Sequence, residues 1–236
     1  RRAVDFSRFL ARGAGKGLAA SLSRDGGRVA LSWRDPQGRG AVLAAPTDGS
    51  NAVDVVLLPR DDIYPGHELI CPGRDDIVSF HGYPDRQNKP DETQDHRVAQ
   101  WRFELSTRAM KPLVLMPRGF RATHCLWGGS GERFYFHRKT VPQWVPTALG
   151  SVDRDGGDER IYYETSEHKL GHSAPSPDEQ WIVTDSQDPD KNILMLVSTV
   201  RNEQHMLCWP DASIGSGRPD RRPVSLPPHT DRHTHP

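Results

Sequence analysis

The sequence predicts an all-β fold, because short apolar or alternating segments follow one another along the chain with turn residues between them. Helical periodicity is nearly absent. Glycine and proline contribute 21 and 20 of the 236 residues, which is enough to supply many tight turns. No apolar stretch approaches the roughly 20 residues that span a bilayer, and 31 basic side chains balance 31 acidic ones. We therefore expect neither a membrane nor a nucleic acid as a partner.

Four segments share a pattern in which a turn is followed by an apolar strand. They begin at Ser23, Cys71, Gly128 and Ser176, at intervals of 48, 57 and 48 residues. Periods of about 40–50 residues with four strands each are typical of the blades of a β-propeller. The sequence therefore predicts a single β-propeller domain over residues 1–236. The predicted blades are 17–58, 66–116, 121–164 and 170–209, with the start of a further blade at 229–236.

Each repeat divides into four predicted strands bounded by Asp, Gly or Pro. They lie at 17–22, 28–34, 40–45 and 52–58 in the first repeat, and at 66–71, 76–81, 98–105 and 112–116 in the second. The third repeat has 121–126, 133–137, 144–152 and 160–164, and the fourth has 170–174, 181–185, 192–198 and 204–209. A polar insertion separates His81 from His96, and loops of that length in compact β folds are often functional.

A histidine stands four residues before the turn in three of the four repeats. The four positions are Ala19, His67, His124 and His172. Chance agreement of this kind has a probability of roughly one in a hundred, after allowing for the positions scanned. The first strand of a propeller blade lines the central channel, so we expect these slot histidines (His67, His124 and His172) to converge around one axis. Convergent imidazoles bind metal ions or transfer protons. The alternative is that each bonds the backbone of a neighbouring blade.

More histidines stand near the C-terminus, at His229, His233 and His235. Residues i and i+2 of a strand share a face, so His233 and His235 are candidates to bind one metal ion. The alternative is a solvated histidine-rich tail or a purification tag. The sequence also offers His67, His81 and Arg138 as candidate substrate contacts, with a structural role or a solvated strand end as the alternative for each.

The three cysteines, Cys71, Cys125 and Cys208, are an odd and widely spaced set, which argues against a disulfide framework. Cys71 and Cys125 fall in apolar segments and are interpreted as small buried hydrophobic residues. No signal peptide is visible, so a cytoplasmic location is expected, with the periplasm as the alternative.

Several short motifs together resemble the oligogalacturonate lyase family of polysaccharide lyases. They are VSFHG at 78–82, HRVAQW at 96–101, THCLW at 123–127, LGHSAPSPD at 170–178 and HTHP at 233–236. Their order and spacing extend the resemblance over roughly residues 60–236. Members of this family are seven-bladed propellers that cleave uronic-acid oligosaccharides by β-elimination.

The resemblance implies a divalent cation, usually manganese, held by His172, His233 and His235. It also implies that His124 removes the C5 proton of the substrate and that Arg97 assists. The family has a glutamine where this chain has Thr230, so the ligand set departs from the family pattern at that position.

Two other functions fit the same residues. One is a non-catalytic binding or scaffold module similar to TolB propellers, which share the Ser-Pro-Asp turn at 176–178. The other is a propeller lyase for a different uronate polymer such as ulvan. A seven-bladed ring at about 50 residues per blade needs more chain than 236 residues. We therefore expect the sequence to be most of a propeller with at least one end missing, and to be less stable and inactive by itself.

Overall fold

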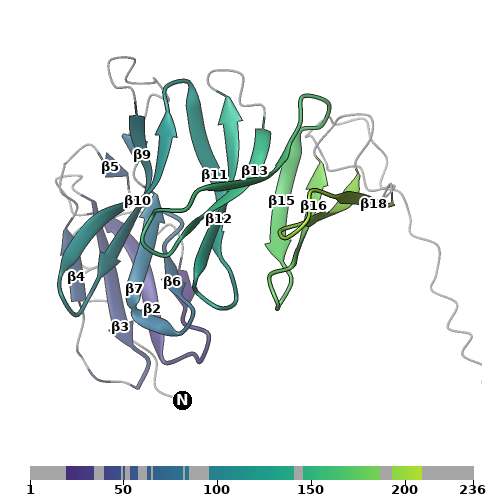
Figure 1. Cartoon of the computed structure of the whole chain (residues 1–236). Coiled ribbons are helices and arrows are strands. Elements are labelled where there is room, and N and C mark those ends of the chain that lie inside the picture. The colour runs from purple at the N-terminus through teal and green to yellow at the C-terminus, as the bar shows by residue number, and fades with distance from the viewer. Residues whose placement is uncertain are drawn as a thin grey trace, which may run out of the picture.

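The computed structural model describes residues 20–34, 40–48, 50, 54–57, 63–64, 66–81, 83–84, 96–140, 146–186 and 193–208. Every regular element in these ranges is a β-strand, which confirms the predicted all-β fold (Figure 1). Within the described residues there is no helix long and apolar enough to span a membrane.

Sixteen of the strands form four antiparallel sheets of four strands each, which we call blades 1 to 4. Blade 1 contains β1 (Ala20–Leu22), β2 (Arg28–Arg34), β3 (Gly40–Pro46) and β4 (Asp54–Leu57). Blade 2 contains β6 (Leu69–Cys71), β7 (Arg74–His81), β9 (His96–Glu104) and β10 (Ala109–Pro117). Blade 3 contains β11 (Phe120–Trp127), β12 (Arg133–Thr140), β13 (Pro146–Asp153) and β14 (Arg160–Glu164). Blade 4 contains β15 (Leu170–Pro175), β16 (Trp181–Ser186), β17 (Leu194–Ser198) and β18 (Gln204–Cys208).

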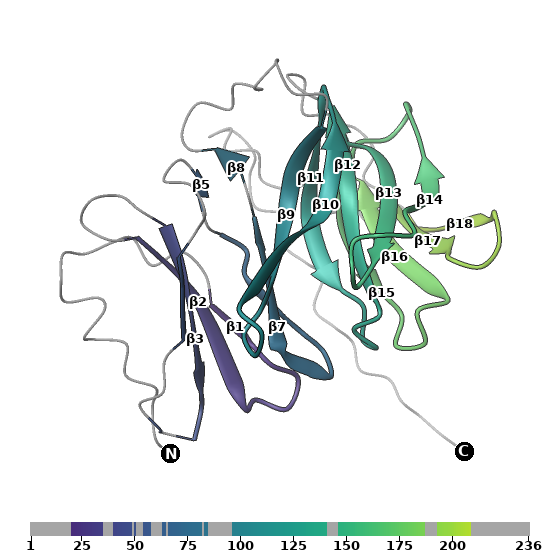
Figure 2. The same cartoon turned by 60° about the vertical axis from the view of Figure 1, so that its left-hand side comes forward.

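The four blades follow one another around a common side, as Figure 2 shows. The first strand of each blade contacts the first strand of the next, so that β1 contacts β6, β6 contacts β11 and β11 contacts β15. This succession of inner strands is the arrangement of a β-propeller. Two short strands outside the blades, β5 (Ile63–Tyr64) and β8 (Tyr83–Pro84), pair with each other beside blade 2. The sequence does not predict them, because two-residue strands carry no periodic signal.

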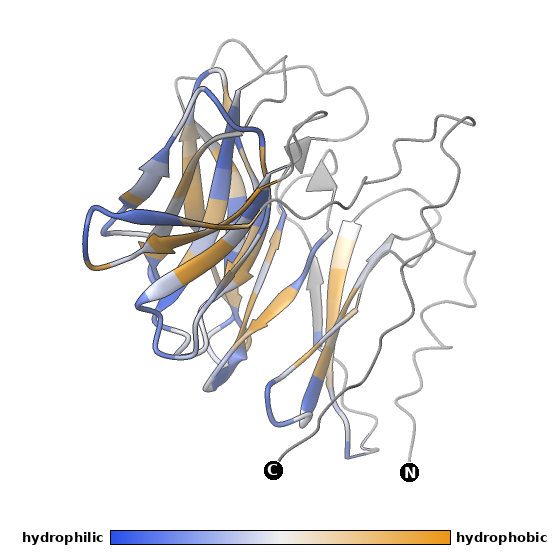
Figure 3. Ribbon diagram, turned by 90° about the vertical axis from the view of Figure 1, so that its right-hand side faces the viewer, coloured by the Kyte–Doolittle hydropathy of each residue, from blue (hydrophilic) through white to orange (hydrophobic). Residues whose placement is uncertain are grey.

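Buried apolar residues of neighbouring blades form three hydrophobic clusters, one between each consecutive pair of blades. Figure 3 shows apolar segments, coloured orange, on the strands of the blades. On β12, Phe134 and Phe136 point into the core shared with blade 2, whereas Tyr135 points into the core shared with blade 4. Successive side chains of a strand alternate between the two faces of its sheet, so one strand supplies both cores. His137 therefore lies on the blade 4 side and Arg138 on the blade 2 side.

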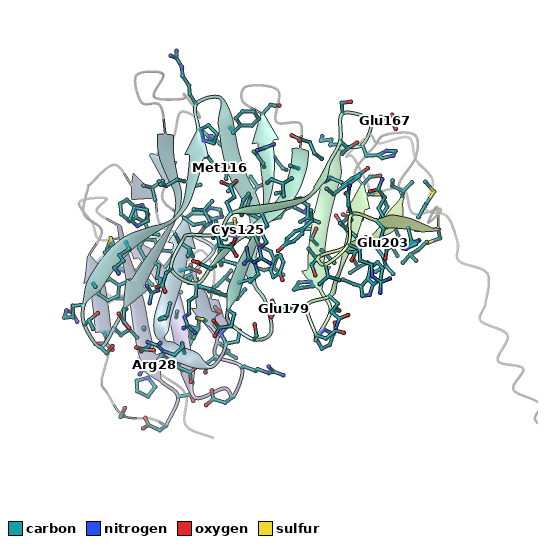
Figure 4. The ribbon with its side chains drawn as sticks, in the orientation of Figure 1. Arg28, Met116, Cys125, Glu167, Glu179 and Glu203 are labelled. Carbon is teal, nitrogen blue, oxygen red and sulfur yellow. The ribbon has the colours of Figure 1, made fainter. Side chains whose placement is uncertain are left out.

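The cysteines behave largely as the sequence predicts. Cys71 is fully buried in the core between blades 2 and 3, and Cys125 packs against the same core (Figure 4). Burial raises the pKa of both thiols to about 12, so both are protonated at neutral pH. Cys71, Cys125 and Cys208 are all free cysteines.

A carboxylate from the repeat turn of blade 4 joins blades 3 and 4. Glu179 accepts hydrogen bonds from the Ser130 backbone N–H (2.8 Å), the Ser130 hydroxyl (2.6 Å) and the Tyr135 hydroxyl (2.9 Å). Figure 4 shows Glu179 at this seam. Glu179 has a φ of 55°, and the equivalent positions of repeats 1 and 3 are Gly26 and Gly131, which also have positive φ. The glutamate therefore accepts backbone strain that glycine avoids, and its side chain provides the contact between the blades.

We expect Glu179→Ala to lower the free energy of unfolding by about 2 kcal/mol. The two hydrogen bonds from Ser130 are exposed to solvent and contribute little. The bond from the Tyr135 hydroxyl is partly buried, and a hydrogen bond to a charged group contributes about 1.5–3 kcal/mol. Glu179→Gly removes the same contacts but relieves the positive φ, so it is expected to cost less than the alanine variant. Urea denaturation of both variants and the wild type measures the difference. Equal stability of Glu179→Ala and the wild type would show that the seam does not depend on this carboxylate.

Candidate functional site

The inner strand of blade 3 has a β-bulge at one of the slot histidines. In β11 the step from Thr123 to Leu126 is paired with the shorter step from His137 to Tyr135 on β12, so β11 has one residue more. His124 lies within this bulge and has a φ of 50°. Left-handed backbone is uncommon for residues other than glycine and is often found at functional sites. The bulge re-aims the His124 side chain relative to a regular strand.

The same irregularity recurs in the neighbouring blades. In blade 2 the segment 66–69 is opposed by the shorter segment 79–81, and in blade 4 the segment 170–173 is opposed by 184–186. His67 has a φ of 49°, close to that of His124. The three slot histidines therefore all lie within a bulge of an inner strand, and the positive φ is shared by His67 and His124.

Five histidines from three blades lie close together and form what we call the histidine cluster. Its members are His67, His81, His124, His137 and His172. The rings of His124 and His172 are stacked with centroids 4.6 Å apart and planes 5° apart, and the ring of His137 lies 5.5 Å from that of His124. His67 and His81 meet edge to face at 4.7 Å. Both His67 and His124 lower the pKa of His81. The pair of His67 and His81 therefore lies near the three rings around His124.

His124 is held as a neutral imidazole with one nitrogen engaged. Its Nδ1 lies against the backbone carbonyl of Gly171 on blade 4. A carbonyl only accepts, so Nδ1 carries the proton and Nε2 carries the lone pair. Burial is the largest cause that lowers the pKa of His124, followed by the charge of Lys139 and by His172. A neutral imidazole with a free lone pair is able to accept a proton at neutral pH.

His81 and His137 are more deeply buried and are already engaged. The Gln100 amide donates to Nδ1 of His81 at 2.8 Å, and the ring also bonds the Ala99 carbonyl. Nε2 of His137 bonds the Ser173 hydroxyl of blade 4. Burial lowers the pKa of each of these two histidines to about 3. Both are therefore neutral near pH 7.

His172 occupies the open side of the cluster. Its side chain is 73% exposed, its backbone N–H donates to the Asp185 carboxylate, and its Nδ1 lies 3.8 Å from the other oxygen of Asp185. An open hollow of about 230 Å³ on blade 4 is lined by His172 and Asp185, together with Thr184 and Leu194. An exposed imidazole beside a carboxylate is a pair of donors that suits Mn²⁺ and similar divalent ions. Within the described part of the chain, no group of three or more such donors converges on one point.

The other predicted site residues are separate from the cluster or lie outside the described residues. Arg138 is on the blade 2 face of β12, where it pairs with Glu164 and lies 5.1 Å from the Phe120 ring. The backbone of Arg97 in β9 pairs with that of Met116 in β10, but the Arg97 side chain lies outside the described residues. His233 and His235, and Thr230 with them, also lie outside.

Sequence reasoning did not assign a role to two residues that adjoin the slot histidines, Lys139 and Asp185, and it considered His137 only together with Arg138, as a candidate carboxylate contact or a solvated strand end. His137 and Lys139 are two residues apart on β12 and share the face toward blade 4, a spacing that was visible in the sequence. Their proximity to His124 depends on the pairing of β11 with β12 in blade 3, which the spacing along the chain does not specify. Asp185 is the penultimate residue of β16, and its contact with His172 likewise depends on pairing between β15 and β16.

No protein-family model matches the chain, and no curated protein matches its sequence. The structure is similar to an oligogalacturonate lyase in complex with manganese, with a TM-score of 0.67 and 15% identity over 84% of this chain and 54% of that one. It is also similar to an oligogalacturonate lyase from Vibrio parahaemolyticus, with a TM-score of 0.66 and 14% identity over 86% and 56%. TolB from Acinetobacter baumannii has a TM-score of 0.55 and 15% identity over 81% and 43%.

At these identities the similarity shows the fold, which is that of β-propeller proteins including oligogalacturonate lyase and TolB. The predicted fold class is therefore confirmed. The chain spans about half the length of the two lyases that it matches.

Proposed function

We propose that the protein cleaves uronic-acid oligosaccharides, with oligogalacturonate as the first choice, by β-elimination in which His124 is the base. The observation that carries this proposal is the state of His124. It is a neutral imidazole on the inner strand of blade 3, with Nδ1 engaged by Gly171 and Nε2 available. Within the described residues, no hydrogen-bond partner occupies Nε2. This is the arrangement that proton abstraction near pH 7 requires.

In the proposed reaction, the C5–H and C4–O bonds of a uronate break and a C4=C5 double bond forms. The C5 proton passes to Nε2 of His124, and the C4 oxygen leaves with a proton from solvent. The negative charge that develops at C5 delocalises into the uronate carboxylate, so a positive group on that carboxylate lowers the barrier. Arg97 is proposed for this role. His67, which is exposed, is proposed to contact the sugar. The ring of His81 packs edge to face against the ring of His67.

We propose that His172 belongs to a divalent-cation site whose other ligands lie outside the described residues, which by themselves hold no group of three or more such donors. We propose His172, His233 and His235 as its ligands and Mn²⁺ as the ion, since one of the lyases that share this fold is a manganese complex. When bound, such a cation would neutralise the substrate carboxylate as a Lewis acid. The ring of His172 is exposed and lies beside the Asp185 carboxylate, so this chain already directs one imidazole toward the open side of the cluster.

A non-catalytic binding module is the alternative, because TolB shares the fold. A scaffold has no need for a neutral imidazole with an open nitrogen on the inner strand, which is why we favour the lyase. A lyase for another uronate polymer, such as ulvan, retains the same site residues and differs only in the sugar backbone that it accepts.

We expect the intact protein to produce unsaturated uronates from de-esterified oligogalacturonides, to lose this activity in EDTA and to regain it when Mn²⁺ is added. The conjugated double bond of the product absorbs near 235 nm, so a continuous absorbance assay measures the reaction. The neutral oligogalactose of the same length serves as the control substrate. If absorbance does not rise on any uronate oligomer with Mn²⁺ present, the proposed function is wrong.

A further inference from the structure

One peptide bond of blade 4 links the proposed base to a carboxylate on the neighbouring strand. The register of β15 on β16 steps from Leu170 to Ser173 across the bulge. Gly171 and His172 therefore lie opposite a single residue, Asp185. A bulge disrupts the backbone ladder, and backbone polar groups that lose their ladder partners need others. The partners of the Gly171–His172 peptide therefore show what holds this bulge.

Side chains bind both polar groups of this peptide. The Asp185 carboxylate accepts the backbone N–H of His172. The carbonyl of the same peptide, that of Gly171, accepts Nδ1–H of His124 across the seam between blades 3 and 4. A peptide bond is planar and trans, so its N–H and C=O point in opposite directions and turn together. The orientation that Asp185 gives to the N–H therefore also sets the orientation in which the carbonyl meets His124.

We propose that Asp185 is a positioning residue for the base His124 and acts through the Gly171–His172 peptide. The carboxylate fixes the plane of the peptide, and the carbonyl of that plane keeps the imidazole proton on Nδ1, which leaves Nε2 for the substrate proton. A carboxylate does this directly for the histidine of a Ser-His-Asp triad. Hydrogen bonds in a chain also polarise one another, so the carboxylate makes the Gly171 carbonyl a stronger acceptor. The role of His124 as the base rests on the proposed function, whereas the chain of hydrogen bonds rests on the contacts alone.

Thr184 holds the same bulge from the other side of His172. Its hydroxyl donates to the His172 carbonyl at 3.0 Å, and only 1% of the residue is exposed. Side chains of β16 therefore bind His172 at its N–H and at its carbonyl. The His172 ring stacks on that of His124 with centroids 4.6 Å apart. The bulge thus places both a carbonyl and a ring against His124.

The competing explanation is that Asp185 serves His172 alone. Its second oxygen lies 3.8 Å from Nδ1 of the His172 ring, and the two residues line the same hollow. Under this explanation, loss of the carboxylate alters the bulge or cation binding but leaves the proton of His124 on Nδ1. Under the proposal, that proton loses its fixed position. The tautomer of His124 therefore separates the two explanations, and it is measurable without substrate or metal.

The experiment is a long-range ¹H–¹⁵N correlation spectrum of the intact protein, labelled with ¹⁵N-histidine, in EDTA at pH 8. This spectrum reports the tautomer of each imidazole, and the signals that His124→Gln lacks are those of His124. Asp185→Leu is expected to lower the fraction of His124 with its proton on Nδ1 from nearly all to about half or less, because the carbonyl no longer selects one nitrogen. Asp185→Asn is expected to retain the tautomer, because its amide oxygen is able to accept the same N–H.

Turnover of de-esterified oligogalacturonides at saturating Mn²⁺ is the second readout. Asp185→Leu is expected to lower kcat by up to about a hundredfold, a loss that a misplacement of about 1 Å can cause, with little change in KM. Asp178→Leu is the matched control, because Asp178 accepts the backbone N–H of Gln180 at 3.2 Å in the repeat turn of the same blade. This control is expected to leave both the tautomer of His124 and kcat unchanged.

The proposal is overturned if Asp185→Leu leaves the tautomer of His124 unchanged, or if Asp178→Leu changes it equally. It is also overturned if the tautomer shifts while a measurable kcat stays the same, because the base then does not depend on this bond. If Asp185→Leu does not fold, Thr184→Val carries the test: a shifted tautomer supports the proposal and an unchanged one overturns it. A tautomer that depends on Asp185 in a protein without any turnover refutes the lyase but supports the positioning role. If the wild-type proton is on Nε2, both proposals fail.

Discussion

Replacing His124 by alanine is expected to lower the turnover of de-esterified oligogalacturonides by about 10²–10⁴-fold, the usual contribution of a positioned general base. The reason is the geometry of its ring, in which the Gly171 carbonyl holds Nδ1 and leaves Nε2 to accept the proton. Continuous absorbance near 235 nm measures turnover. Binding of Mn²⁺, measured separately by calorimetry, is expected to be unchanged, because His124 is proposed as the base and not as a ligand.

His124→Gln is the sharper variant. A glutamine amide is able to donate to the Gly171 carbonyl as the imidazole does, but it is not a base. We therefore expect Gln to preserve the structure of the seam and still abolish turnover. His205→Ala is the matched control, since His205 is an exposed histidine of β18 beside Trp181. Retained activity in His124→Gln would exclude His124 as the base, and loss of Mn²⁺ binding in His124→Ala would make it a ligand.

Acidification is expected to destabilise the fold through His81 and His137. Burial lowers the pKa of each to about 3 in the folded protein, against about 6.5 in the unfolded chain. Below pH 6.5 the unfolded chain therefore takes up protons that the folded protein does not, and stability falls with pH until about pH 3. At pH 5 each histidine is expected to have cost about 2 kcal/mol relative to pH 7.5, or about 4 kcal/mol for both.

Urea denaturation at pH 7.5 and pH 5.0 tests this expectation. The double variant with His81→Gln and His137→Gln lacks both titrating groups and is expected to lose less stability between the two pH values than the wild type. Comparing the loss of unfolding free energy between pH 7.5 and pH 5.0 in the two proteins removes the contribution of the other titrating groups, which both proteins share. An equal loss in both would show that these imidazoles are already protonated, or accessible to water, in the folded protein.

The strand pattern could be predicted because it depends on local features of the sequence. Apolar residues of β12 alternate between two cores, and turn residues bound each repeat, so every predicted strand overlaps an observed one. The register of His67, His124 and His172 was also visible, because it needs only the spacing from the turn. What the spacing could not show is the bulge, which exists only as a mismatch between paired strands.

The sequence by itself determined the all-β repeat architecture and the recurrence of histidine on the inner strands, since both follow from periodicity along one chain. The tertiary structure alone decided the state of each imidazole. Partners on blade 4 engage Nδ1 of His124 and Nε2 of His137. Both partners of His81, Gln100 and Ala99, come from β9 of its own blade. The physical reason is that desolvation and hydrogen bonding depend on neighbours distant in sequence, which no spacing along the chain specifies.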